Sequence, residues 1–201
     1  QRTRNRLPFS WQNICDFSFS HIYDKINKRY YFSFLNTQFD IDNIVVINLL
    51  YRNIGFVYKG NLDIDNFKKI ATSKLSFINR QIGSGIRNFV EDLIDIDGIN
   101  RDEIKGYNDC VKTHNEVGLK ICFTDKDVGI STEYIADLYK LNFTFLIKER
   151  FDLVIYKDRY FEKKNQKFIE FIKNSSFLKE ISHLKGYDTT DSGKILFKDF
   201  D

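Results

Sequence analysis

The segment FINRQIGSGIRNF, residues 77–89, holds the strongest local signal for chemistry. A helix that begins after its two glycines would present backbone N–H groups and about half a positive charge, which suits an anion. Arg80 and Arg87 lie on either side of this helix start, and the spacing predicts an anion between them. The residues expected at this site are Asn79, Arg80, Gly83, Ser84, Gly85 and Arg87. The alternative is a glycine-containing turn with two surface arginines, since the segment matches neither a P-loop nor the dinucleotide fingerprint.

A second helix start follows at Thr113 and His114. Thr113 and Glu116 have the spacing of a capping box, which puts His114 at the first helical position beside more free N–H groups. His114 is then either a ligand contact or a solvent-exposed histidine next to a good cap. Ser20 and His21 end the first expected strand. They are either ligand contacts or, as the alternative, a core serine and a surface histidine.

The sequence offers little support for catalysis. Its three histidines fall in no HExxH or GxSxG pattern. The three cysteines, at unrelated spacings, fit neither a zinc pattern nor a disulfide framework, which favours a reducing compartment. We therefore expect no enzyme activity, no metal and no cofactor. Glu149 and Arg150 lie near Asp152 on an expected strand, and an arginine flanked by acids is more often a structural ion-pair network than a site.

Short β-branched or aromatic runs alternate with helical patterns, which is typical of an α/β fold. Ser84 and Gly98 are the expected N-terminal and C-terminal caps of the helix after the glycines, and Asp63 or Asp65 is the expected cap of an earlier one. From Leu75 the alternation predicts a doubly wound parallel arrangement, with ligands at the carboxyl ends of the strands. Strands are expected over 15–23, 43–51, 54–60, 75–81, 104–111, 127–131 and within 143–156, and helices over 62–71, 85–97, from 113, over 133–141 and over 161–184.

Composition excludes several function classes. The charge is +3, from 31 basic and 28 acidic residues, which is too balanced to predict nucleic-acid binding. The most apolar run, residues 44–50, is far shorter than the roughly 20 residues of a membrane span. The first residues carry three arginines without an apolar stretch behind them, which does not fit an intact signal peptide. We expect a cytoplasmic location, with a periplasmic protein or extracellular lipoprotein as the alternative.

Several motifs, taken in order over residues 16–196, resemble one known family. They are FINRQIGSGIR, IKGY, THNEVGLKI, DVGIS, ERFDLVI and GYDTTDSGKI. Together they resemble the substrate-binding, periplasmic-binding-protein-like domain of molybdopterin-biosynthesis and LysR-like regulators. Such domains occur fused to helix-turn-helix DNA-binding modules, and some relatives look like transporter binding proteins.

The resemblance implies a type II periplasmic-binding-protein-like fold, with two doubly wound lobes and a ligand cleft. The first lobe would combine residues 12–59 with 150–196, and the second would cover 60–149. Family members begin with a strand and a helix that have no match here, so we expect an incomplete first lobe and a possible homo-oligomer. The implied ligand contacts are Ser20, His21, Asn79, Arg80, Gly83, Ser84, Gly85, Arg87, Thr113, His114 and Glu149.

Three functions are compatible with this resemblance. The first is a non-catalytic domain that binds or senses a small ligand, an oxyanion such as molybdate or tungstate, within a transcriptional regulator. The second is the extracytoplasmic substrate-binding protein of an ABC transporter for such anions. The third is an enzyme module of molybdenum-cofactor biosynthesis, for which the residues supply no nucleophile with an oriented base.

Overall fold

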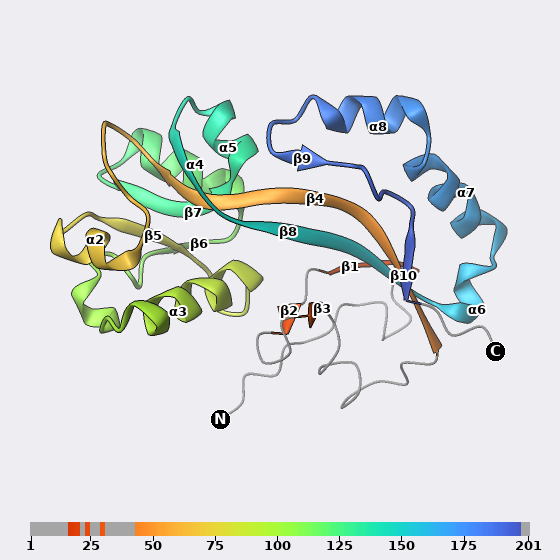
Figure 1. Cartoon of the computed structure of the whole chain (residues 1–201), viewed down its shortest axis with the longest axis horizontal. Helices are drawn as coiled ribbons and strands as arrows, with labels where there is room; N and C mark the ends of the chain where they lie inside the picture. Colours follow the sequence, from red (N-terminus) through yellow and green to blue (C-terminus); the bar gives the residue numbers. More distant parts are fainter. Residues whose placement is uncertain (1–15, 21–22, 25–28, 31–42, 198–201) are drawn as a thin grey trace. The chain divides into compact units, whose positions relative to one another are not determined.

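The computed structural model describes residues 16–20, 23–24, 29–30 and 43–197. It divides into two compact units, one formed by residues 52–148 and the other by residues 1–51 together with 149–201. The chain passes between the units within two long strands, β4 (Ile44–Tyr58) and β8 (Asn142–Tyr156), as Figure 1 shows. The fold is therefore α/β, as the alternation of patterns predicts.

The unit of residues 52–148 is built on a mixed sheet. The end of β4 runs antiparallel to β7 (Val128–Thr132), which is parallel to β5 (Phe77–Arg80). On its other side β5 is parallel to β6 (Cys110–Val111), so the carboxyl ends of these two strands meet at one edge. The helices of this unit are α2 (Phe67–Thr72), α3 (Gly85–Asp97), the 3-10 helix η3 (Arg101–Glu103), α4 (His114–Phe123) and α5 (Glu133–Leu138).

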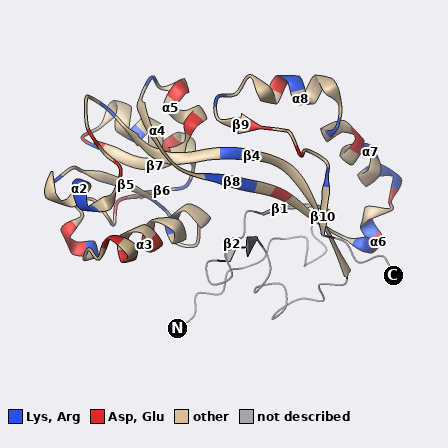
Figure 2. Ribbon diagram, viewed as in Figure 1, with Lys and Arg blue, Asp and Glu red and all other residues tan. Residues whose placement is uncertain are grey.

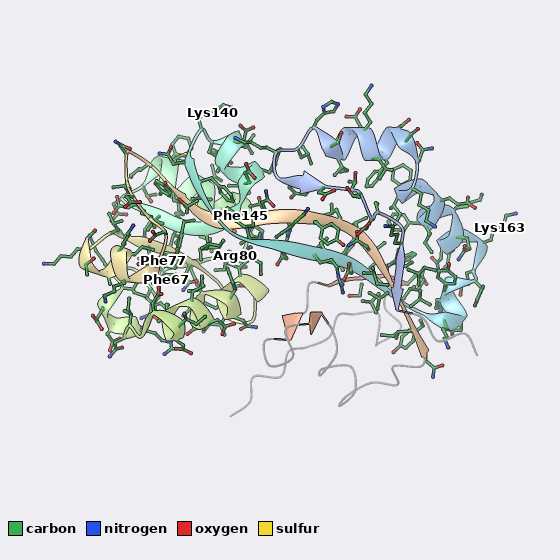
Figure 3. The ribbon with its side chains drawn as sticks, viewed as in Figure 1. Phe67, Phe77, Arg80, Lys140, Phe145 and Lys163 are labelled. Atoms are coloured by element: carbon green, nitrogen blue, oxygen red, sulfur yellow. The ribbon has the colours of Figure 1, made fainter. Side chains whose placement is uncertain are left out.

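Aromatic and aliphatic side chains fix the strands of this unit against its helices. Phe67 of α2 lies edge-on between Phe56 and Phe77, with ring centroids 5.4 and 5.3 Å apart (Figure 3). The expected apolar stripe of α3 packs here: three of its residues are buried and two are partly buried. They are Ile86, Val90 and Ile94, and Phe89 and Leu93. On a separate cluster, Val117 and Ile121 of α4 are fully buried. This packing holds the starts of α3 and α4 at the edge where β5 and β6 end.

The other unit has an antiparallel arrangement. β1 (Ser18–Ser20) pairs with the end of β8, with Ser20 opposite Asp152. The start of β4 pairs with β10 (Ile195–Phe197), and β9 (Tyr187–Asp188) also pairs with β4. β2 (Tyr23–Asp24) and β3 (Arg29–Tyr30) pair with each other. The helices among its described residues are α6 (Lys157–Tyr160), α7 (Lys163–Ile172) and α8 (Ser175–Ser182). Ile169 and Ile172 of α7 join the apolar residues of β4 and β8 in one core.

Several expected elements differ from those observed. Residues 43–51 and 54–60 form no pair of strands joined by a turn, because β4 runs without a break from Ile44 to Tyr58. At Gly55 of β4, strand β8 lies too close for a side chain. A Cβ atom there would lie 2.1 Å from the carbonyl oxygen of Thr144. Most of 104–111 is a turn, since Tyr107 N–H donates to the Ile104 carbonyl and Gly106 has a φ of 81°. Within this range only Cys110–Val111 forms a strand.

Helix ends were predicted with mixed success. Ser84, Gly98 and Thr113 cap helices as expected. Asn66, and neither Asp63 nor Asp65, caps α2, because both carboxylates instead accept from the Lys69 ammonium. The helix expected over 161–184 is divided into two helices, α7 and α8. The strand expected over 15–23 is observed at 18–20 and begins again at 23, with 15, 21 and 22 outside the described residues. In the described part of the chain, every helix is too short or too polar to cross a bilayer.

Candidate anion site at the carboxyl edge of β5 and β6

Arg80 ends β5 and reaches across to the start of α4. Its Nη2 donates to the carbonyl oxygen of Lys112 at 2.7 Å. A backbone bond joins the same two segments, since Gln81 N–H donates to the Val111 carbonyl at 3.0 Å. Arg80 is labelled in Figure 3. The sheet therefore brings the guanidinium to the segment that leads into α4, as the sequence predicts for residues after neighbouring parallel strands.

The N-terminus of α3 lies directly after this arginine. Ser84 caps the helix: its Oγ accepts from the Arg87 backbone N–H at 3.1 Å, and its own N–H donates to the Gln81 carbonyl. Gly83 has a φ of 88°, which a glycine adopts without strain. The first turn of α3 has no acidic residue, and Figure 2 shows the acids of this helix toward its other end. The positive end of the helix dipole is thus not neutralised from within α3.

The N-terminus of α4 differs, because an acid already occupies it. Glu116 Oε2 accepts from the backbone N–H of Lys112 at 2.9 Å and from that of Thr113 at 2.7 Å. The Thr113 hydroxyl also lies 3.0 Å from this oxygen, and Thr113 Oγ1 accepts from the Glu116 N–H. The bonds from the Thr113 side chain and backbone lower the pKa of Glu116. The predicted capping box is confirmed, and its carboxylate takes two of the N–H groups that we expected to face a ligand.

His114 opens α4, at the first helical position as predicted. Its Nδ1 lies 3.1 Å from Ser131 Oγ, and the Ser131 hydroxyl donates to the His114 carbonyl at 3.2 Å. A hydroxyl has one proton, so when Ser131 donates it to the His114 carbonyl, the Nδ1–H tautomer of His114 donates to Ser131. A serine nucleophile would need the opposite direction, and Ser131 is fully buried. Sequence reasoning missed Ser131, although its place before the Thr132 cap of α5 marks the end of a strand.

Two of the predicted ligand contacts have partners within the protein. Arg87 is buried, its Nε donates to Glu91 at 2.8 Å, and its guanidinium lies 4.2 Å from the centroid of the Tyr107 ring. The expected anion between Arg80 and Arg87 is therefore not needed to explain Arg87. Asn79 is buried as well, with Nδ2 donating to the Tyr107 carbonyl and Oδ1 accepting from the Arg80 N–H. Through these contacts Arg87 and Asn79 have a structural role next to the site.

The remaining predicted contacts belong to the other unit. Ser20 lies on β1, His21 falls outside the described residues, and Glu149 is buried. Arg150 Nε donates to Asp152 at 2.7 Å, and Asp152, which is fully buried, also accepts from Asn48 at 3.0 Å. The interpretation of the acids around Arg150 as a structural network fits these contacts.

Comparison with known proteins gives a family match over most of the chain. The family model described as "PBP superfamily domain" matches residues 11–173. The uncharacterized protein YvgK of Bacillus subtilis (strain 168) is 28% identical over 200 residues. That alignment covers 96% of this chain but only 63% of the relative, so the chain spans less than two thirds of that protein's length.

Solved structures with this fold include binding proteins and regulatory domains. A putative phosphate ABC transporter substrate-binding protein with bound phosphate, from Clostridium perfringens, has a TM-score of 0.63 at 11% identity, with 90% of this chain and 81% of that one covered. The tungstate ABC transporter structure from Geobacter sulfurreducens has a TM-score of 0.60 at 15% identity, with coverage of 87% and 79%. The Synechocystis PCC6803 CcmR regulatory domain in complex with 2-PG has a TM-score of 0.57 at 13% identity, with coverage of 82% and 74%. At such identities these likenesses establish the fold alone.

Proposed function

This chain belongs to the family of PBP superfamily domains, and on that premise we propose that it is a non-catalytic binding domain for a small oxyanion. The observation that carries the proposal is the acid-free N-terminus of α3 beside Arg80, at one edge of the sheet. Helix N–H groups and a guanidinium are the donors that proteins use for oxyanions. Ser84, Gly85 and Arg80 would contact the anion, with His114 contributing from the start of α4.

We further propose that binding serves sensing, as the ligand domain of a cytoplasmic transcriptional regulator. The likeness to the CcmR regulatory domain supports this role, and a helix-turn-helix module would lie in a further part of the protein. The second candidate is the substrate-binding protein of an ABC transporter, which the likeness to the phosphate and tungstate proteins favours. Catalysis receives no support from the His114–Ser131 pair, because Ser131 is fully buried.

The test is calorimetric titration of the chain with molybdate, tungstate, sulfate and phosphate. One charge-assisted hydrogen bond is worth roughly 1.5–3 kcal/mol, so Arg80→Ala should weaken binding about 10- to 150-fold. Arg101→Ala is the control, because it removes the same charge from the same unit. Arg101 pairs with Glu91 and Asp95. The affinity of this variant should stay within a few-fold of the parent's. An unchanged affinity of Arg80→Ala for every oxyanion that the parent binds would place the site elsewhere.

A further inference from the structure

We propose that Glu116 is a specificity-determining residue, which restricts the ligand to an anion with a single charged group. The inference rests on the proposed oxyanion site at Arg80 and α3. It concerns the neighbouring start of α4, which the family resemblance treats as a second source of ligand contacts. In our proposal this end of the site repels negative charge.

One residue, Lys112, links the positive and the negative group of the site. Its carbonyl oxygen accepts from Arg80 Nη2 at 2.7 Å, while its backbone N–H donates to Glu116 Oε2 at 2.9 Å. The guanidinium and the carboxylate thus contact the two polar groups of the same residue. Through Lys112, an anion held by Arg80 and the N-terminus of α3 would be brought near the Glu116 charge.

The two helix starts are electrostatically unequal. α3 has no acid in its first turn, whereas α4 has Glu116, which is held by the N–H groups of Lys112 and Thr113. A charged group is therefore favoured at α3 and opposed at α4. A second anionic group on the same ligand, extending toward α4, would approach the carboxylate. A neutral polar group would meet no such repulsion and would have His114 nearby.

Other charges near α4 moderate this repulsion without reversing it. The Lys112 ammonium is exposed to solvent, which screens its interactions, and His114 contributes a positive charge only when it is protonated. Repulsion between unit charges several ångströms apart, in partly exposed surroundings, corresponds to roughly a 3- to 10-fold loss of affinity. That loss is large enough to measure and small enough to depend on one residue.

The experiment compares Glu116→Gln with the parent, using sulfate as the one-group probe and pyrophosphate as the two-group probe. Glutamine keeps the capping box, because its amide oxygen can accept the same N–H bonds, so the fold is retained. The affinity for pyrophosphate relative to sulfate should rise roughly 3- to 10-fold in Glu116→Gln.

Glu103→Gln is the matched control, since Asn100 and Glu103 form the other capping box of this unit. That box follows the C-terminal end of α3, a 13-residue helix about 20 Å long, so it lies far from the site. Its pyrophosphate-to-sulfate ratio should equal that of the parent. An unchanged ratio in Glu116→Gln, or a parent that prefers pyrophosphate, overturns the proposal. If instead sulfate binds equally well to the parent and to Arg80→Ala, the proposed oxyanion site itself is wrong.

Discussion

At the scale of single residues, Glu91 accepts hydrogen bonds from three polar side chains near the candidate site. One carboxylate oxygen accepts from Arg87 and from the Tyr107 hydroxyl, and the other accepts from Arg101. Burial by itself would raise the pKa of Glu91, but the bonds from Tyr107, Arg101 and Arg87 lower it overall. Glu91 therefore neutralises the buried guanidinium of Arg87, near the start of α3.

We predict that Glu91→Gln lowers the free energy of unfolding by about 1–3 kcal/mol, because it leaves the Arg87 charge buried without its counter-ion. The parent should also lose stability in acid. The pKa is lower in the folded chain than its ordinary value of 4.5, so Glu91 stabilises the fold above that value and ceases to do so as pH falls through the lowered pKa.

Urea unfolding at pH 7 and at pH 3 checks both statements. The gap between parent and Glu91→Gln should be largest at pH 7 and should shrink as the pH is lowered. Glu103→Gln, an exposed acid in the same unit, should cost less than Glu91→Gln at pH 7. A gap that is independent of pH would contradict the assigned role.

At the scale of elements, the start of α3 combines a structural and a proposed binding role in one residue. Ser84 accepts the Arg87 N–H and so caps the helix, while the same helix end is the proposed anion site. These two roles respond differently to a negative charge at this position. Aspartate is also a good cap and interacts favourably with the helix dipole.

Ser84→Asp should therefore keep or raise the stability of the chain and lose oxyanion binding, because its carboxylate occupies the place of the ligand. Ser84→Ala should lower the free energy of unfolding by roughly 1 kcal/mol through loss of the cap, with a smaller effect on binding. Thermal unfolding and calorimetric titration of the two variants give the comparison. Oxyanion binding that survives in Ser84→Asp would show that the N-terminus of α3 is not the site.

At the scale of the whole molecule, ligand binding and unfolding are linked. Each unit has its own hydrophobic core, and the chain crosses between them twice, in β4 and β8. The proposed site is formed by folded elements, α3 and the end of β5, so the unfolded chain should not bind the anion. Binding should therefore stabilise the folded molecule by mass action.

An oxyanion at 100 times its dissociation constant should add about 2.7 kcal/mol of stability. For a chain of this size that corresponds to a rise in Tm of roughly 5–10 °C. Scanning calorimetry with the oxyanion, against chloride at equal ionic strength, measures the effect. Arg80→Ala should show a much smaller rise at the same concentration. A rise that chloride reproduces would indicate a general salt effect.

The amino-acid sequence by itself determined the α/β class, the helix after the glycines, its caps at Ser84 and Gly98, and the capping box at Thr113. These features depend on hydrogen bonds and apolar spacings within a few residues, which the local pattern records. The family motifs, spread over the chain, were sufficient to indicate the periplasmic-binding-protein-like fold.

Only the tertiary structure decided which partners each charged group has within the protein. Arg80 and Arg87 are alike in sequence terms, yet Arg87 is buried against Tyr107 and Glu91 while Arg80 reaches Lys112. The unbroken course of β4 likewise depends on β7 and β8, which come more than 60 residues later in the chain. Such contacts join residues distant in sequence, and their partners are selected by packing and desolvation rather than by local spacing.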